Sequence, residues 1–131
     1  MSGMSRFNTL SAAQTDHEHG VQLGLLQELC RAAREHRDAT AVGGILEQLI
    51  AYSEVHFTSE ELLMRLKSYD AYEDHVDDHI HMLDVLNQIA GDHAAGNSSL
   101  VSGKAEELLA FIGHHIATRD KRFADFVRKA H

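Results

Sequence analysis

Apolar positions recur along the chain in steps of three and four residues, which is the spacing of one face of an α-helix. The clearest run is His75, His79, Met82, Leu86 and Ile89, in steps of four, three, four and three. Similar stripes occupy three other segments, and short polar or glycine-containing stretches separate the four. The pattern predicts helices at about residues 16–37, 40–66, 71–93 and 100–129.

Local motifs suggest where these helices begin. Thr15-Asp16-His17-Glu18 is a capping-box pattern, in which a threonine hydroxyl and a glutamate carboxylate satisfy free backbone N–H groups. The first helix is therefore expected to begin there, after an N-terminal arm at residues 1–15. Asp70 followed by Glu73 predicts a similar cap for the third helix. Gly96-Asn97-Ser98-Ser99 marks the loop before the fourth.

Composition agrees with one all-α domain over residues 1–131. A chain of this size, 44% hydrophobic and 24% charged, can bury its own core. It contains no proline, the residue that most strongly interrupts helices. Four amphipathic helices of similar length with short connections favour an antiparallel up-down-up-down four-helix bundle.

Charge and cysteine usage exclude several classes of function. The formal net charge of −8 argues against nucleic acid or an anionic membrane as the main partner. The single cysteine, Cys30, cannot form an internal disulfide, so nothing indicates an oxidising compartment. No segment has the roughly 20 apolar residues of a membrane span, and residues 1–14 lack a signal-peptide pattern. A cytoplasmic protein is expected.

Histidine is abundant, and its placement is informative. Of eleven histidines, five occupy positions that the periodicity assigns to the interior, together with one glutamate: His19, His56, His75, His79, His115 and Glu60. One buried histidine is usually an ordinary core residue. Burying an unpaired carboxylate costs on the order of several kcal/mol, and a multivalent cation held by the whole set would compensate for it.

The spacing within helices supports a metal site. Residues four apart lie about 40° apart on one helix face, so His56 with Glu60, and His75 with His79, each present two donors together. His17 and His114 are the only serious rival ligands. The remaining histidines are expected to be solvated or to cap helices.

Four motifs then follow one another along nearly the whole chain. Asp16–His19 fits D-x-x-H, and residues 56–64, HFTSEELLM, fit H-F-x-x-E-E-x-x-M. His75–His79 fits H-x-x-x-H, and residues 115–120, HIATRD, fit H-I-x-x-x-D. In this order and at these intervals they resemble the motifs of the hemerythrins, in particular the single-domain bacterial ones.

The resemblance implies a non-haem di-iron centre. Its ligands would be His19, His56, Glu60, His75, His79, His115 and Asp120. His75, His79 and His115 would bind one iron and His19 and His56 the other, with Glu60, Asp120 and an oxide or hydroxide bridging both. One coordination position then stays open on the iron with two histidines. The implied function is reversible dioxygen binding for carriage, storage or delivery, without catalytic residues and with at most a weak peroxidase side activity.

Two further expectations concern the surroundings of this centre. Reversible binding requires a dry apolar shell, for which the candidates are Leu23, Leu26, Phe57 and Ile112. His115 and Asp120 are five residues apart, about 140° on an ideal helix, and the apolar stripe slips by one residue there. A π-bulge near Ala117-Thr118 is therefore predicted.

The sequence also departs from the family pattern. Phe111 stands where bacterial members commonly have tryptophan, and a phenylalanine there should still fill the core. Gly113 is smaller than expected beside a sealed pocket, so it either opens a path to the irons or simply allows a helix or ligand to pass close by.

Other functions remain as alternatives. A ferritin-like di-iron oxidase or peroxidase would use Glu-x-x-His pairs, and none occurs here. A helical phosphotransfer module would need an exposed histidine beside lysine, which fits poorly. An oxygen- or redox-sensing domain that signals through a separate partner is the second interpretation, and a protein partner could equally receive the dioxygen.

Overall fold

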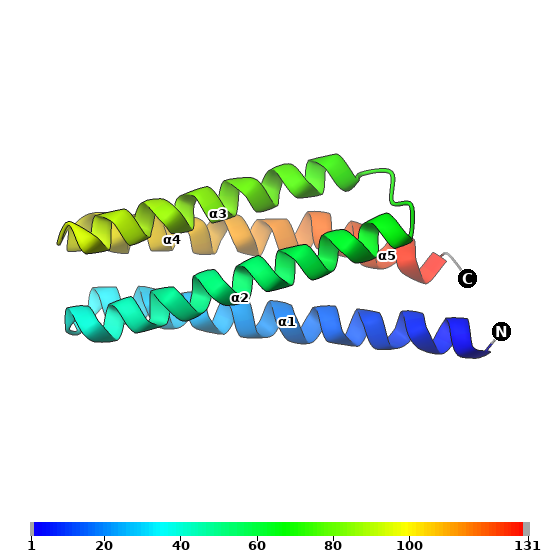
Figure 1. The fold of residues 1–131 in the computed structure, drawn as a ribbon, viewed down its shortest axis with the longest axis horizontal. Helices are drawn as coiled ribbons and strands as arrows, with labels where there is room; N and C mark the ends of the chain where they lie inside the picture. Colours follow the sequence, from blue (N-terminus) through cyan, green and yellow to red (C-terminus); the bar gives the residue numbers. More distant parts are fainter. Residues whose placement is uncertain (1, 130–131) are drawn as a thin grey trace.

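Helices account for nearly all of the chain in the computed structural model, which describes the backbone of residues 2–129 and the side chains of residues 17–129. They are α1 (Ser2–Arg34), α2 (Ala39–Leu66), α3 (Tyr72–Ala94), α4 (Ser98–His115), the π-helix η1 (Ile116–Asp120) and α5 (Lys121–Lys129). The last three continue one another as a single rod (Figure 1). The four predicted helical segments are therefore present.

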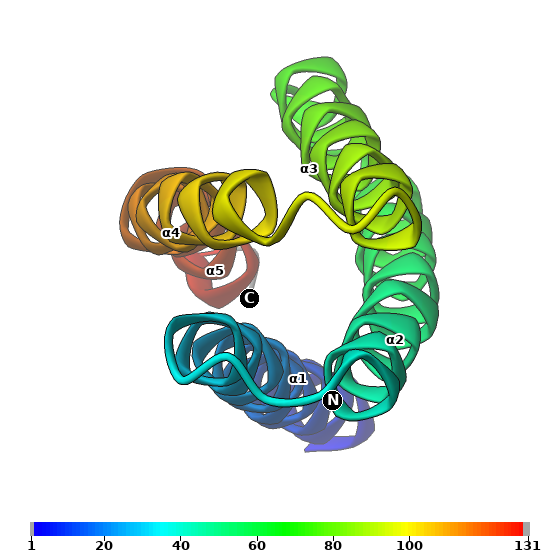
Figure 2. The ribbon, with the colours of Figure 1, turned by 90° about the vertical axis from the view of Figure 1, so that its left-hand side faces the viewer.

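These rods form an antiparallel four-helix bundle. Helices α1 and α3 each pack against both α2 and α4. The α1–α2 and α3–α4 connections lie at one end, which faces the viewer in Figure 2, and the α2–α3 connection lies at the other (Figures 1 and 2). Side chains such as Leu26, Leu49, Met82, Leu86 and Ile89 are fully buried between the helices. The predicted all-α bundle is confirmed.

Two predicted helix starts are wrong. Helix α1 runs unbroken from Ser2, so Thr15 lies inside it, and residues 2–15 continue the helix instead of forming a separate arm. A capping box works only where the preceding chain leaves the helix, and nothing before Thr15 makes it do so. Helix α3 begins after Ala71 without a side-chain cap, so Asp70 does not cap it. Asp38 caps α2 instead, accepting a hydrogen bond from the Ala41 N–H at 2.8 Å.

The ends of α1, α2 and α3 share one geometry. His36, Ser68 and Gly96 follow these helices with φ of 52°, 53° and 78°. In each case the next N–H bonds back to a carbonyl five residues earlier: Arg37 to Ala32, Tyr69 to Met64 and Asn97 to Asp92, at 3.1, 3.0 and 2.9 Å. This is the Schellman motif, which satisfies free carbonyls and reverses the chain within a few residues.

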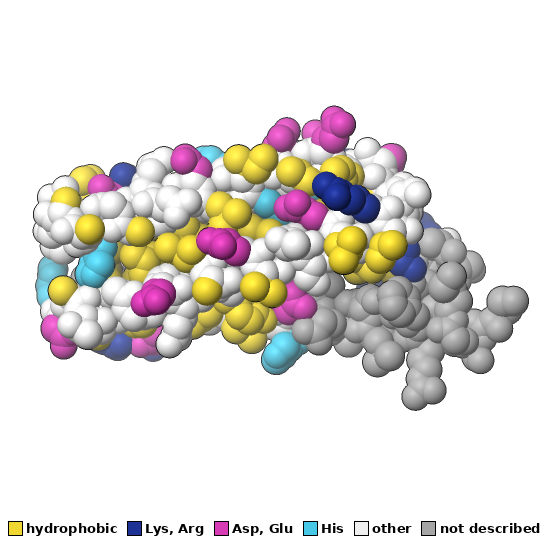
Figure 3. Space-filling view, viewed as in Figure 1, with side chains coloured by type: hydrophobic (Ala, Val, Ile, Leu, Met, Phe, Trp, Pro, Cys, Tyr) yellow, Lys and Arg dark blue, Asp and Glu magenta, His cyan; other side chains and the backbone are white. Residues whose placement is uncertain are grey.

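The apolar character of the helices can be compared with what a membrane span requires. Across the described residues, no helix combines the length and the apolar character needed to cross a bilayer. Carboxylates are spread over the face seen in Figure 3, including the parts of α2 and α3 that line it.

Candidate metal centre

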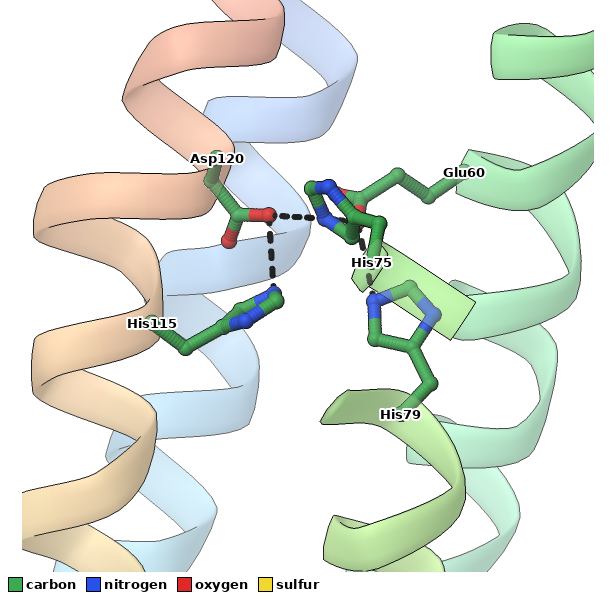
Figure 4. Close-up of side chains that lie close together, drawn as sticks. All are labelled: Glu60, His75, His79, His115 and Asp120. Carbon is green, nitrogen blue, oxygen red and sulfur yellow. Dashed lines mark hydrogen bonds and ion pairs between the residues drawn. The ribbon is translucent and has the colours of Figure 1, made fainter. Parts of the chain in front are cut away.

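All seven predicted ligand residues lie in the interior of the bundle, none more than 8% exposed. They come from every rod: His19 from α1, His56 and Glu60 from α2, His75 and His79 from α3, His115 from the end of α4 and Asp120 from the end of η1. Figure 4 shows five of them converging from α2, α3 and the α4–η1 rod. The structure therefore brings the whole predicted set together.

Glu60 lies between two groups of histidines. Its Oε1 is 2.7 Å from Nε2 of His75 and 3.0 Å from Nε2 of His79. Its Oε2 is 3.1 Å from Nε2 of His19 and 3.8 Å from Nε2 of His56. One carboxylate oxygen thus faces a three-histidine group (His75, His79 and His115) and the other faces a two-histidine group (His19 and His56).

Asp120 repeats this division. Its Oδ1 is 2.6 Å from Nε2 of His75 and 3.0 Å from Nε2 of His115, whereas its Oδ2 is 2.9 Å from Nε2 of His19. Both carboxylates therefore span the two groups. The donor atoms of Glu60, Asp120 and the three-histidine group lie within 4.8 Å of one another, as do those of Glu60 and the two-histidine group.

Unpaired atoms test whether these residues fit a metal. Oε1 of Glu60 and Nε2 of both His79 and His115 are buried and lie within 3.0 Å of a neighbouring nitrogen or oxygen, but among the described residues none of the three forms a well-aligned hydrogen bond. Buried polar atoms are nearly always hydrogen-bonded, so three such atoms in one cluster indicate missing partners. Imidazole nitrogens and carboxylate oxygens are ligands that suit iron. The donor set therefore fits metal cations, iron among them.

A second layer of carboxylates orients the imidazoles. Each pair joins Nδ1 of one histidine to a carboxylate from a different helix: His56 with Glu18, His79 with Glu61 and His115 with Asp78, at 2.7, 2.8 and 2.8 Å. An Nδ1–H donated outward leaves the Nε2 lone pair directed inward, as metal ligation requires. The sequence pattern does not identify these three residues as part of the site. Their only signal is that each stands directly beside a proposed ligand: Glu18 before His19, Glu61 after Glu60 and Asp78 before His79.

The cluster holds protons when no metal is present. Burial disfavours a charge on His19, but hydrogen bonds with Asp120 and Glu60 outweigh it and raise the pKa of His19 to about 10. The same balance raises the pKa of His75 to about 9. Burial opposes the charge of Glu60 and Asp120 as well, yet hydrogen bonds from the histidines lower the pKa of both carboxyl groups. Metal binding would have to displace the histidine protons.

The π-helix η1 explains how His115 and Asp120 share this site. Residues 116–120 form one π-turn, as predicted. His115, which precedes it, and Asp120, its last residue, are both buried, at 3% and 6% exposure. A π-turn accommodates one additional residue, so side chains five apart lie on one face. Phe123 and Val127 then resume the buried stripe in α5.

The predicted apolar shell is mostly buried. Leu26, Phe57 and Ile112 are at most 3% exposed, whereas Leu23 is only half-buried. The ring of Phe57 stacks on His79, with centroids 4.1 Å apart. Phe57 therefore restrains a proposed ligand besides filling space.

One polar pair also lies in the interior. Gln22 and Ser53 are almost fully buried, and Gln22 donates a hydrogen bond to the Ser53 hydroxyl at 3.0 Å. They stand three residues from His19 and His56, toward the end of the bundle that carries the α1–α2 connection. Neither residue is among the four predicted shell residues, and the hydrogen bond satisfies both polar side chains in the interior.

The residues considered as alternative metal ligands, or as an opening to the metal centre, lie outside the cluster. His17 and His114 are exposed. Gly113 is exposed too, and a Cβ added there would meet nothing within 4 Å, so it faces away from the interior and opens no path. Phe111 is half-buried against His81. Burial raises the pKa of the Cys30 thiol to about 11, consistent with a packing role.

Comparison with known proteins agrees with this arrangement. The family model described as the hemerythrin HHE cation binding domain matches residues 11–127. No curated protein and no solved structure matches the chain.

Proposed function

The chain belongs to the hemerythrin family, and on that premise we propose that it binds dioxygen reversibly at two iron ions held in the core of the bundle. The family domain is a cation-binding one. The proposed ligands are His19, His56, Glu60, His75, His79, His115 and Asp120, with Glu60, Asp120 and an oxide or hydroxide as bridges.

The observation that carries this proposal is the division of both carboxylates between the two histidine groups. Glu60 and Asp120 each direct one oxygen to the three-histidine group and one to His19 of the two-histidine group. A single-ion site would not require either carboxylate to span two groups. The unequal number of histidines supports an open position on the side of His19 and His56.

Bound iron would supply the electrons and the coordination position that dioxygen requires. The protein's own part is to position and to shield. Five imidazoles direct Nε2 inward, and the outer carboxylates Glu18, Glu61 and Asp78 hold the Nδ1 protons of three of them. Leu26, Phe57 and Ile112 exclude water from the interior. A histidine-rich, shielded site favours binding and release over oxidation of a substrate.

A visible spectrum of the iron-loaded, reduced protein tests the proposal. We expect a charge-transfer absorption that appears under dioxygen and disappears when dioxygen is removed. His19→Gln should weaken this absorption, whereas His17→Gln, an exposed neighbour on the same helix, should leave it unchanged.

Other outcomes would favour the alternatives. An absorption that appears once and does not reverse would support an oxidase, a peroxidase or a redox sensor acting through a separate partner. Iron binding without any response to dioxygen would contradict the proposal.

A further inference from the structure

A surface pocket of about 500 Å³ lies where the α2–α3 connection meets η1 and α5. Its walls include Tyr69 and Asp70 from the connection and Thr118 from η1. From α5 come Lys121, Arg122, Asp125, Phe126 and Lys129. This volume is within the range of small-molecule sites. Nothing in the proposed dioxygen chemistry uses this pocket.

The pocket wall carries three cations and two carboxylates, a net excess of one positive charge. Neither Arg122 nor Lys129 forms an ion pair with a carboxylate in the part of the chain that the structure describes, whereas neighbouring Lys121 lies 3.3 Å from Asp125. The excess of positive charge at this wall contrasts with the net charge of −8 of the chain as a whole. This excess favours an anionic ligand.

Aromatic rings line the same pocket and continue inward. The Tyr69 ring lies 5.0 Å from Phe126 and 4.9 Å from Phe123 between centroids. Phe123 is buried and lies 6.3 Å from the ring of His75, a proposed iron ligand. A row of packed rings therefore leads from the pocket to the candidate metal centre.

We propose that this pocket binds a planar aromatic anion of the flavin nucleotide class and is the point where electrons enter the metal centre. The phosphate would pair with Arg122 and Lys129, and the flavin ring would stack against the half-buried Phe126, which packs on Tyr69 beneath it. One dihydroflavin releases two electrons and two protons as it becomes flavin. The electrons reduce two ferric ions to ferrous, and the protons pass to solvent. The electron-entry part rests on the proposed function, whereas binding does not.

Binding is tested with flavin mononucleotide and the metal-free protein, by flavin fluorescence. We expect saturable binding that Arg122→Glu/Lys129→Glu weakens at least tenfold. The matched control is Arg31→Glu/Arg34→Glu, which makes the same change in net charge in the last turn of α1, at the opposite end of the bundle (Figure 1). It should bind like the wild type. Absence of saturable binding, or equal loss in both variants, would overturn the proposal.

Electron entry is tested by anaerobic reduction of the oxidised, iron-loaded protein. Reduced flavin mononucleotide should react faster than reduced riboflavin, which lacks the phosphate, and Arg122→Glu/Lys129→Glu should remove this difference. Equal rates for the two flavins in the wild type would refute electron entry here. Flavin binding by a protein that takes up no iron would refute the proposed function and leave the pocket assignment intact. Dioxygen binding without flavin binding would refute the pocket assignment and leave the proposed function intact.

Discussion

Asp78 on α3 accepts a hydrogen bond from Nδ1 of His115 at the end of α4, at 2.8 Å. The same carboxylate oxygen lies 3.2 Å from Nε of Arg119 in η1. Asp78 therefore connects three elements around one proposed iron ligand. Because Asp78 contacts Nδ1 and lies outside both candidate metal clusters, we expect it to orient His115 and not to bind the metal itself.

Asp78→Asn is expected to weaken iron binding without unfolding the bundle. The amide can still accept a hydrogen bond from His115 but carries no charge to polarise the ring. Loss of such an outer partner typically lowers metal affinity about 10- to 100-fold. Competition with a chromogenic Fe(II) chelator measures this. Asp77→Asn, which removes the same charge from an exposed neighbour, is the control. Equal affinities for the two variants would show that Asp78 does not orient the ligand.

The stability of the metal-free protein should fall as the pH rises above neutrality. In the folded state the pKa values of His19 and His75 are raised from 6.5 to about 10 and about 9. The stabilisation from their ion pairs is therefore complete below pH 6.5 and is lost between pH 6.5 and about 10. The pKa values of Glu60 and Asp120 are lowered, so their contribution is present above pH 4.5 and is lost in acid.

Thermal unfolding of the chelator-treated protein between pH 5 and 9.5 tests whether its stability falls with rising pH as expected. Metal binding requires neutral histidines, so the gain in Tm on adding Fe(II) should increase over the same range in which the metal-free Tm decreases. His19→Gln should flatten the metal-free profile. A metal-free Tm that rises from pH 6.5 to 9.5 would contradict the ion pairs.

The helix interiors and the site could be predicted from the sequence because both depend on periodicity. A stripe with steps of three and four places His75 and His79 inside the bundle whatever the neighbouring helix is, and the slip between His115 and Asp120 requires an additional residue in the turn. Local cap signals were less reliable. The Thr15 pattern fits a helix interior as well as a helix start, since serine, threonine and aspartate occur in both.

The outer carboxylates could not be predicted in the same way. Glu18, Glu61 and Asp78 have side chains 14%, 25% and 21% exposed, so periodicity assigns them to the border of the solvated face. Their partners lie on other helices, and the relative shift of two packed helices along their axes decides which carboxylate meets which histidine. Only the three-dimensional packing contains that information.

Ser68→Gly should stabilise the protein, and Gly96→Ala should destabilise it. Both residues occupy the left-handed position of a Schellman motif, with φ of 53° and 78°. A side chain there costs about 1–2 kcal/mol, and the greater flexibility of unfolded glycine offsets about 0.5–1 of this. The free energy of unfolding is therefore expected to rise by about 0.5–1 kcal/mol in Ser68→Gly and to fall by about the same amount in Gly96→Ala. Urea unfolding of the metal-free variants measures it, with Ser68→Ala as the control that keeps the strain. A loss of stability in Ser68→Gly would argue against this account.

Deleting Thr118 should leave the stability of the fold intact while impairing the metal site. Thr118 is exposed within η1, and its hydroxyl donates a hydrogen bond to the carbonyl of His114. Without it, α4 can continue into α5 as a regular α-helix, with the histidine and the aspartate four apart and still on one face. The buried stripe through Phe123 and Val127 is preserved, so the metal-free variant should be as stable as the wild type or more stable.

Iron binding by this deletion variant should nevertheless be weaker, roughly tenfold or more, by the same Fe(II) competition. Asp120 contacts His75, His19 and His115 at 2.6–3.0 Å, and a turn of different rise and rotation cannot keep all three distances. Deleting Glu107 instead, in the regular part of α4, would rotate every later residue by about 100° and should abolish cooperative folding. If the Thr118 deletion binds iron like the wild type, the π-turn is not needed to position Asp120, and its presence must be explained by packing alone.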